Sequence, residues 1–279
     1  MKDEFDSLAG GSSSGDQGGR ELGELEESLR SRCSEGKKLL IPYVTAGMCA
    51  EWVEIVLALE AGGADAIEIG IPFSDPMMDG PVIQRASAKA LLRGTTPVGV
   101  LGELARASLS VPVVVMTYYN LVLHMGHYRM AHELRAAGVS GVIIADLPLE
   151  ELGPWSSESD GLGIATVLMV APTTTPQRAA AICKRSQGFV YCVSRMGVTG
   201  EQGTLGSAAA SLAKRIKGLT DMPVCIGIGV SSAKQAVEAC QEADGVVVGS
   251  SLVRRVLEGE GTAGVEAFIG EMRRALDSI

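Results

Sequence analysis

The sequence lacks the features that mark proteins of nucleic acids or membranes. Lysine and arginine form no runs and the formal net charge is −9, so long-range repulsion disfavours nucleic acids and anionic membrane surfaces. No apolar stretch is long enough to span a membrane, and the N-terminus has no basic segment followed by an apolar one. We therefore expect a cytoplasmic protein that binds small metabolites or protein partners.

The sequence also lacks a disulfide framework. Its six cysteines lie far apart and form no CxxC pair, and several fall in apolar segments such as VYCVS and PVCIGIG. Such residues in a reducing compartment are free buried thiols. The fold must then depend on its core, for which an apolar content of 46% provides ample material.

The N-terminal part of the chain divides into a tail and a helix. Residues 1–19 are rich in glycine, serine and acidic residues, which predicts a disordered tail. Residues 20–279 are expected to form a single domain. Within Glu21–Arg32, three leucines recur at helical spacing and predict an amphipathic helix that covers one end of this domain.

After this helix, short β-branched runs alternate with longer Ala/Leu-rich helical segments. The eight runs are LLIPYVT, AIEIG, VPVVVMTY, GVIIADL, IATVLMV, GFVYCVS, MPVCIGIG and GVVVGS. Almost continuously apolar strands in alternation with helices indicate a parallel sheet that is buried on both faces. Eight of them predict an α/β fold of the (β/α)8 TIM barrel type with an extra N-terminal helix. An open doubly wound sheet is the alternative, but it favours five or six strands and an early glycine fingerprint, which this chain lacks.

In such a barrel the chemistry belongs at the C-terminal ends of the strands. Glu68 lies near the end of the second run, and Asp75 and Asp79 lie in the loop that follows. Burial raises a carboxyl pKa whereas a solvated carboxylate stays ionised, so Glu68 is the candidate for proton transfer. The alternative is a structural glutamate satisfied by backbone or by a lysine inside the barrel, although no nearby strand carries one. Asp79 could equally be part of an Asp-Gly-Pro turn that starts a helix.

Two glycine-rich regions follow later strands. The loop VSRMGVTGEQGTLG, residues 193–206, is a candidate lid, with a plain surface loop as its alternative. The segments IGIGVSSA and VVVGSSLV each pass from a strand through glycine and serine into a helix. Backbone N–H groups of Gly229, Gly249 and Ser250 could thus bind one anion, which predicts a substrate with a phosphate group.

Other polar residues carry weaker signals. His124, His127 and His132 have no HExxH spacing and few carboxylate partners, so we expect loop histidines and no metal site. Asp146 ends the fourth run and could be a third catalytic acid or could orient its loop. A further set is expected to pack against an apolar part of a substrate or partner; it comprises Met77, Met78 and Tyr118.

Several motifs together resemble one known family. EIGIPFSDPMMDGPVIQRA, LIPYVTAG, SRMGVTG and GIGVSS followed by VVVGSSLV match the tryptophan synthase α chain in order and spacing, from about Leu22 to the C-terminus. The resemblance implies a carbon–carbon lyase that cleaves indole-3-glycerol phosphate to indole and glyceraldehyde 3-phosphate in a retro-aldol reaction. It implies no cofactor on this chain, and a partner β subunit that carries pyridoxal phosphate and uses the indole for tryptophan biosynthesis. Two chains of each kind would form a heterotetramer.

The resemblance also implies residue roles. Glu68 would protonate C3 of the indole and help to remove the glycerol hydroxyl proton, and Asp79 would stabilise the positive charge on the ring. Tyr191 matches the tyrosine that supports the glutamate. Thr199 matches the lid threonine that bonds the aspartate, and Asp75 a loop aspartate linked to lid closure and to the β chain. The phosphate-binding positions match Gly200, Gly229, Gly249 and Ser250.

Three alternatives stay open from the sequence. The chain could be a free-standing lyase that releases indole with the same residues. It could be a non-catalytic regulatory subunit that has kept a phosphate site, although the presence of both Glu68 and Asp79 argues against this. Another phosphate-binding barrel enzyme, such as an epimerase, fits the topology but not the two carboxylates and the lid together.

Overall fold

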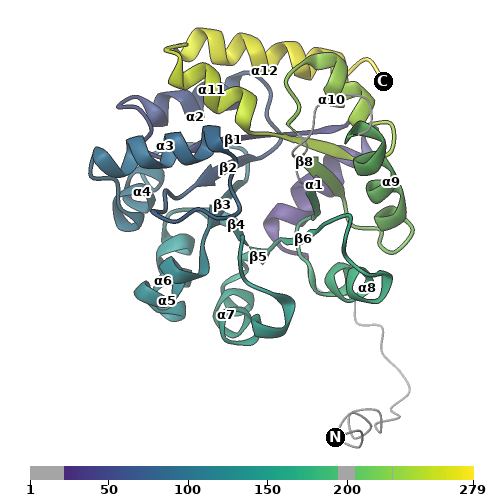
Figure 1. Ribbon diagram of the computed structural model, residues 1–279, viewed down its shortest axis with the longest axis horizontal. Helices are drawn as coiled ribbons and strands as arrows, with labels where there is room; N and C mark the ends of the chain where they lie inside the picture. The colour runs from purple at the N-terminus through teal and green to yellow at the C-terminus, as the bar shows by residue number, and fades with distance from the viewer. Residues whose placement is uncertain (1–21, 194–204, 228) are drawn as a thin grey trace, which may run out of the picture.

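The computed structural model of the chain describes residues 22–193, 205–227 and 229–279. Strands and helices alternate around a central barrel (Figure 1). The strands are β1 (Leu39–Thr45), β2 (Ile67–Gly70), β3 (Val113–Thr117), β4 (Val139–Ile144), β5 (Ala165–Thr166), β6 (Leu168–Val170), β7 (Val190–Val193), β8 (Val224–Gly227) and β9 (Gly245–Val248). The predicted disordered tail, residues 1–19, lies outside the described residues.

Helices surround the strands. They are α1 (Glu24–Ser34), α2 (Trp52–Ala61), α3 (Pro81–Leu92), α4 (Pro97–Leu104), α5 (Tyr119–Met125), α6 (His127–Ala136), α7 (Gly153–Ser159), α8 (Pro176–Arg185), α9 (Leu205–Lys217), α10 (Ala233–Ala239), α11 (Ser250–Leu257) and α12 (Thr262–Leu276). Two short 3-10 helices are η1 (Leu149–Glu151) and η2 (Asp160–Leu162). None of these helices is both long and apolar enough to cross a membrane.

The strands form one parallel sheet in the order β5-β4-β3-β2-β1-β9-β8-β7-β6. The two strands at the ends of this order are halves of the predicted fifth strand. Val167 between them still donates its N–H to the carbonyl of Val142 at 2.9 Å, whereas Leu168 donates to the hydroxyl of Ser186 at 2.9 Å. The fifth strand thus pairs first with β4 and then with β7, and in this way it closes the ring. The predicted eight-strand barrel is confirmed, with its fifth strand divided in two.

The apolar strands account for the core. Every residue of β1, β2, β4 and β9 is buried, because the outer face of each strand packs on helices and the inner face fills the barrel. All six cysteines are free thiols; four are buried, while Cys33 and Cys49 are partly exposed. The prediction of free thiols is therefore confirmed, but burial holds for only four of them.

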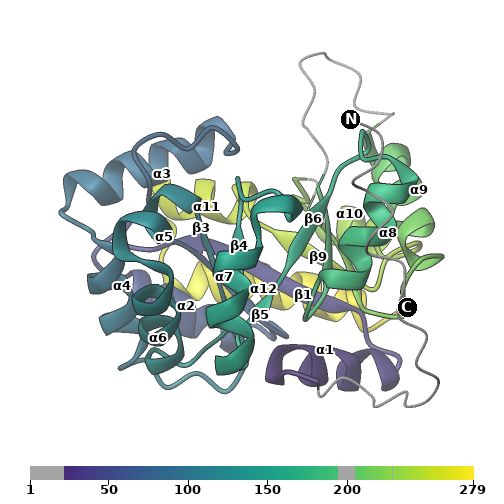
Figure 2. The ribbon, with the colours of Figure 1, turned by 90° about the horizontal axis from the view of Figure 1, so that it is seen from below.

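Helix α1 closes the end of the barrel from which the strands start (Figure 2). Leu25 and Leu29 are fully buried, whereas Leu22 precedes the helix and is exposed. Leu25 occupies the space that Gly141 and Gly188 leave free, since a Cβ on either glycine would lie 2.6 or 2.5 Å from a methyl carbon of Leu25. The predicted N-terminal helix is confirmed, and the opposite end of the barrel is left for the functional site.

Candidate active site

Glu68 lies in the middle of β2 with its side chain inside the barrel. Only 1% of the residue is exposed. Its Oε2 atom is buried and has no hydrogen-bond partner within the described part of the chain. Burial first, and then the negative charge of Asp79, raise the pKa of the Glu68 carboxyl to about 8. A structural glutamate would have its oxygens satisfied, so this unsatisfied oxygen favours a functional role.

Asp79 lies in the loop between β2 and α3 and is half-buried. Burial raises its pKa to about 6, and a hydrogen bond with the Tyr118 hydroxyl opposes this rise. The same hydroxyl accepts a hydrogen bond from the N–H of Met78 at 3.1 Å, so Tyr118 anchors the β2–α3 loop. The predicted helix entry is also present, because α3 begins at Pro81 directly after this loop. Asp79 therefore lies in the turn before α3, but its carboxylate does not cap the helix and stays available for chemistry.

The two carboxyl groups differ in charge near neutral pH. With a pKa of about 8 Glu68 keeps its proton at pH 7, whereas Asp79, with a pKa of about 6, is ionised. The arrangement places a proton donor beside a fixed negative charge, a combination suited to chemistry in which a cationic centre develops.

Tyr43 on β1 belongs to this site and was not predicted. It lies in register with Glu68, so both side chains point into the barrel. Its hydroxyl lies 3.3 Å from the Thr45 hydroxyl, and a Cβ on Gly70 would overlap it at 1.9 Å. Burial first, then the charge of Asp79, raise the Tyr43 pKa well above its ordinary value, so it remains a neutral donor. Only the strand register reveals this residue, since its strand is uniformly apolar around it.

Tyr191 on β7 reaches the same interior from the far side of the barrel. It is buried, and its hydroxyl lies where Gly227 leaves room, since a Cβ there would be 2.3 Å away. Burial first, and next the charge of Glu68, raise the Tyr191 pKa well above its usual range. Asp75 is instead exposed in its loop, where its carboxylate accepts a hydrogen bond from Ser74 at 2.6 Å. The structure thus places Tyr191, but not Asp75, close to the carboxyl pair.

The predicted phosphate positions lie on two adjacent loops. Gly229 has a left-handed φ of 65° after β8, and Gly249 precedes α11, whose first residue is Ser250. The hydroxyl of Ser251 donates to the carbonyl of Val230 at 2.6 Å and so ties these loops together. A phosphate would meet backbone N–H groups there. Thr199 and Gly200 lie outside the described residues, as does the rest of the predicted lid between residues 194 and 204.

The remaining candidates have local partners. Asp146 is exposed and accepts the backbone N–H of Tyr119 at 2.6 Å, which agrees with the loop-orienting alternative. His127 hydrogen-bonds the Tyr119 hydroxyl at 2.9 Å, and His132 packs against the ring of Tyr128. Within the described ranges no group of three or more potential ligands could hold a metal ion. Two apolar side chains of the β2–α3 loop remain exposed on the surface, Met77 and Met78.

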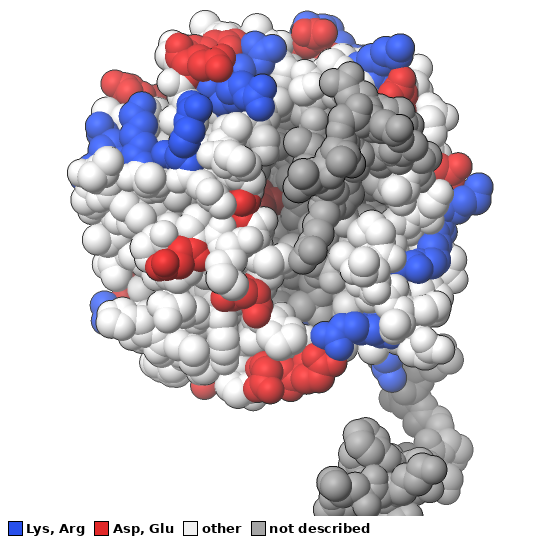
Figure 3. Space-filling view, in the orientation of Figure 1, with Lys and Arg blue, Asp and Glu red and all other residues white. Residues whose placement is uncertain are grey.

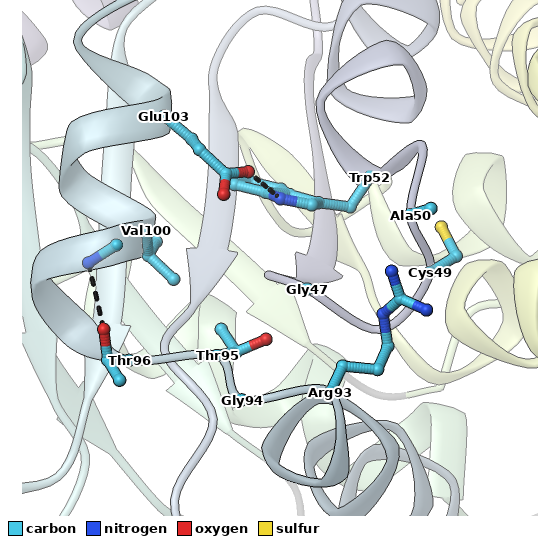
Figure 4. A pocket seen from close by; sticks show the side chains of 11 residues that line it. Gly47, Cys49, Ala50, Trp52, Arg93, Gly94, Thr95, Thr96, Val100 and Glu103 are labelled. Atoms are coloured by element: carbon cyan, nitrogen blue, oxygen red, sulfur yellow. Dashed lines mark hydrogen bonds between the residues drawn. The ribbon is translucent and has the colours of Figure 1, made fainter.

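Figure 3 shows the end of the barrel opposite α1, where acidic side chains lie in a central hollow. A separate cavity of about 190 Å³ lies to one side, between the β1–α2 loop and the α3–α4 connection (Figure 4). Trp52 donates its indole N–H to Glu103 at 2.5 Å across one wall of this cavity. None of its lining residues belongs to the carboxyl pair or to the two phosphate loops, so we assign it no part in the chemistry.

The sequence model of one family, described as tryptophan synthase alpha chain, matches residues 29–275. The chain belongs to this family. A tryptophan synthase alpha chain from Streptomyces coelicolor is 41% identical over 260 residues, which cover 90% of this chain and 96% of that protein. The alpha chain from Thermobifida fusca is 42% identical over 84% of this chain and 89% of its own length. The role implied for this chain is that of the alpha subunit of the synthase, a lyase subunit whose name implies a beta partner.

Solved structures agree with this assignment. A chain of tryptophan synthase from Mycobacterium tuberculosis has a TM-score of 0.85 and 39% identity, covering 92% of this chain and 99% of its own. The alpha subunit from Legionella pneumophila has a TM-score of 0.84 and 30% identity, covering 92% of this chain and 100% of its own. The family inferred from the motifs and the barrel inferred from the strands are both confirmed.

Proposed function

We propose that the chain catalyses the retro-aldol cleavage of indole-3-glycerol phosphate to indole and glyceraldehyde 3-phosphate, a carbon–carbon lyase reaction. The observation that carries this proposal is the carboxyl pair formed by Glu68 on β2 and Asp79 in the loop that follows. Glu68 is buried and protonated near neutral pH, and Asp79 beside it is ionised. A bond to an aromatic carbon breaks only after that carbon is protonated, and this pair supplies both the proton and the compensating charge.

The proposed reaction needs two proton transfers and no external reagent. Glu68 donates its proton to C3 of the indole, and the carboxylate of Asp79 accepts the ring N–H and stabilises the cation. The C3–carbon bond then breaks, its electrons restore the indole, and the glycerol hydroxyl becomes the aldehyde. The hydroxyl proton passes to Glu68, which regains its starting state. We assign the positioning of Glu68 to Tyr191 and to Tyr43 on the neighbouring strand, because both are buried and Tyr43 lies in register with Glu68.

The substrate phosphate would bind at the two tied loops. We assign this role to the backbone of Gly229, Gly249 and Ser250, together with Gly200. The bond from Ser251 to Val230 supports the assignment, because it holds the glycine loops in one cluster. Thr199 and Asp75 are proposed to act when the lid closes, through Asp79 and through the beta subunit respectively.

The partner would complete a biosynthetic assembly. We propose a heterotetramer of two alpha and two beta subunits in the cytoplasm, in which the indole passes to a beta subunit that holds pyridoxal phosphate. This chain needs no cofactor of its own, because Glu68 performs both proton transfers and Asp79 stabilises the cation. The names of the relatives support a beta partner, since these relatives are alpha chains of tryptophan synthase.

The test is indole release by the purified chain and by Glu68→Gln, each with and without a beta subunit. We expect slow release that the beta subunit accelerates and that Glu68→Gln lowers by roughly 10²–10⁴-fold. The control is Glu54→Gln, the same substitution at an exposed position on α2, which should leave release unaltered.

No release even with a matched beta subunit would refute the lyase proposal and leave a phosphate-binding regulatory subunit. Full activity without any partner would instead identify a free-standing lyase. Equal activity of Glu68→Gln and the parent would keep the reaction but remove Glu68 as its acid.

A further inference from the structure

Helix α3 carries a row of positive charge. Arg85, Lys89 and Arg93 recur at intervals of four residues through the helix and its C-cap, so they lie on one face. All three are exposed, and no acidic residue occurs in the helix. The neighbouring helix α11 packs against α3 and contributes a fourth exposed cation, Arg254. We refer to these four residues as the rim patch.

The rim patch is not neutralised by local acids. Within the described part of the chain, none of its four side chains forms an ion pair, whereas many other exposed cations do so. Arg178, for example, pairs with Glu150, and Lys217 with Asp244 at 2.5 Å. Unpaired like charges along one face repel one another and cost stability. The rim patch therefore presents its positive charge to solvent and to any anion that approaches this face.

The position of the rim patch points to the mouth of the barrel. Helix α3 begins two residues after Asp79, and α11 begins at Ser250, one of the proposed phosphate positions. The space-filling view shows blue side chains gathered over α3 beside the central hollow (Figure 3). Figure 2 places α3 toward the opposite end of the barrel from α1. The N-terminal end of the row therefore lies near the entrance, whereas Arg93 at the C-cap of α3 borders the side cavity.

We propose that the rim patch recruits the phosphate dianion of the substrate and directs it into the barrel, which rests on the function proposed above. The whole chain carries a formal charge of −9, and the carboxyl pair adds negative charge at the mouth. A dianion approaching such a protein is repelled unless a local patch reverses the sign of the potential. The patch acts over a Debye length of about 8–10 Å at moderate salt, so it raises the association rate without contacting the bound ligand.

The experiment compares Arg85→Gln/Lys89→Gln with the control Lys184→Gln/Arg274→Gln. Both double variants remove two exposed cations without ion pairs in the described part of the chain, but Lys184 and Arg274 lie in the last turns of α8 and α12. Arg274 follows Arg273, whose guanidinium bonds to Asp65 just before the start of β2. Lys184 lines a hollow that is also lined by residues of α1. The control pair is thus at the far end of the barrel.

Stopped-flow fluorescence would follow the binding of an unreactive indole-alkyl phosphate to each protein. At low salt we expect the rim variant to associate about fivefold more slowly than the parent, with the dissociation rate unchanged and the control within experimental error of the parent. At about 1 M salt, where the Debye length is about 3 Å, the difference should vanish.

Equal association rates of parent and rim variant at low salt would overturn the proposal. The proposal would also fail if the rim variant bound the probe at the parental rate but was no longer activated by a beta subunit, because the patch would then be a protein-docking surface. Failure of the proposed function itself is distinguishable, since then the parent chain would neither bind this probe nor release indole.

Discussion

At the scale of single residues, the same side-chain type acquires different chemistry from its surroundings. Glu68 is surrounded by apolar strands and Asp79 by a polar loop with a tyrosine hydroxyl, so their pKa values are raised to about 8 and about 6 respectively. The higher pKa of Glu68 makes it the acid, and the lower pKa of Asp79 makes it the anion that stabilises the ring cation. Tyr118 contributes to that order, because its hydrogen bond keeps Asp79 ionised at a lower pH.

The pH dependence of kcat/KM for indole release follows from these values. Activity needs a protonated Glu68 and an ionised Asp79, so it should rise through about pH 6 and fall through about pH 8. The substrate phosphate also titrates near pH 6, which complicates the acidic limb. Tyr118→Phe distinguishes Asp79 from the substrate phosphate. It removes the hydrogen bond that lowers the Asp79 pKa, so the acidic limb should move to higher pH.

A pH profile recorded for Tyr118→Phe beside the parent is the measurement. The substrate phosphate cannot respond to this mutation, and the basic limb of Glu68 serves as an internal control. An acidic limb that stays in place would show that substrate ionisation, not Asp79, limits activity at low pH.

At the scale of elements, α1 shows how one helix completes a barrel. Eight strands alone would leave the barrel open at the end from which the strands start. The two glycines at that end, Gly141 and Gly188, leave space for a side chain. Leu25 fills the space and is fully buried, together with Leu29 one turn later. The active face lies at the opposite end, so this closure contributes to stability and not to chemistry.

Leu25→Ala should therefore destabilise the chain by about 3 kcal/mol, because it removes buried methyl groups and leaves a cavity that the rigid glycine backbone cannot fill. Urea unfolding at neutral pH measures this change. Leu22→Ala, at a residue that is 44% exposed before the helix, should cost no more than about 0.5 kcal/mol. Similar losses in the two variants would show that α1 does not seal the barrel, and a large loss of kcat in Leu25→Ala would contradict the separation of stability from chemistry.

At the scale of the whole molecule, Asp65 joins segments from both ends of the chain. It is 3% exposed, and its carboxylate accepts hydrogen bonds from the N–H of Leu40 at 2.8 Å, the guanidinium of Arg32 at 2.7 Å and that of Arg273 at 2.8 Å. These partners belong to β1, to the last turn of α1 and to α12. The first and last helices are thus attached to the barrel through one carboxylate.

Asp65→Ala should cost about 3–5 kcal/mol of unfolding free energy, because the buried Arg273 guanidinium loses its buried partner and keeps only its ion pair with the partly exposed Asp277. Asp221→Ala is the control: this carboxylate pairs with Arg30 but is 92% exposed, and its loss should cost at most about 1 kcal/mol. Denaturant unfolding of both variants decides the question. A cost for Asp65→Ala no larger than that of the control would mean that the buried ion pairs do not hold the ends together.

Much of this architecture could be predicted because the relevant signals are local. All eight predicted runs contain observed strand residues, and Glu68 stood out as a single acid in an apolar run. Tyr43 and the bond from Tyr118 to Asp79 could not be predicted in the same way. Each depends on which residues of distant segments become neighbours, and a uniformly apolar strand contains no signal for its register.

Apolar periodicity and short motifs, which are properties of neighbouring residues, are sufficient to predict the strand and helix order, the family and the burial of Glu68. The division of the fifth strand, the contacts of Asp65 with the first and last helices and the relative pKa values of Glu68 and Asp79 arise only in the folded barrel. These properties depend on burial and on charges brought together from separate segments, and burial is known only when the barrel has closed.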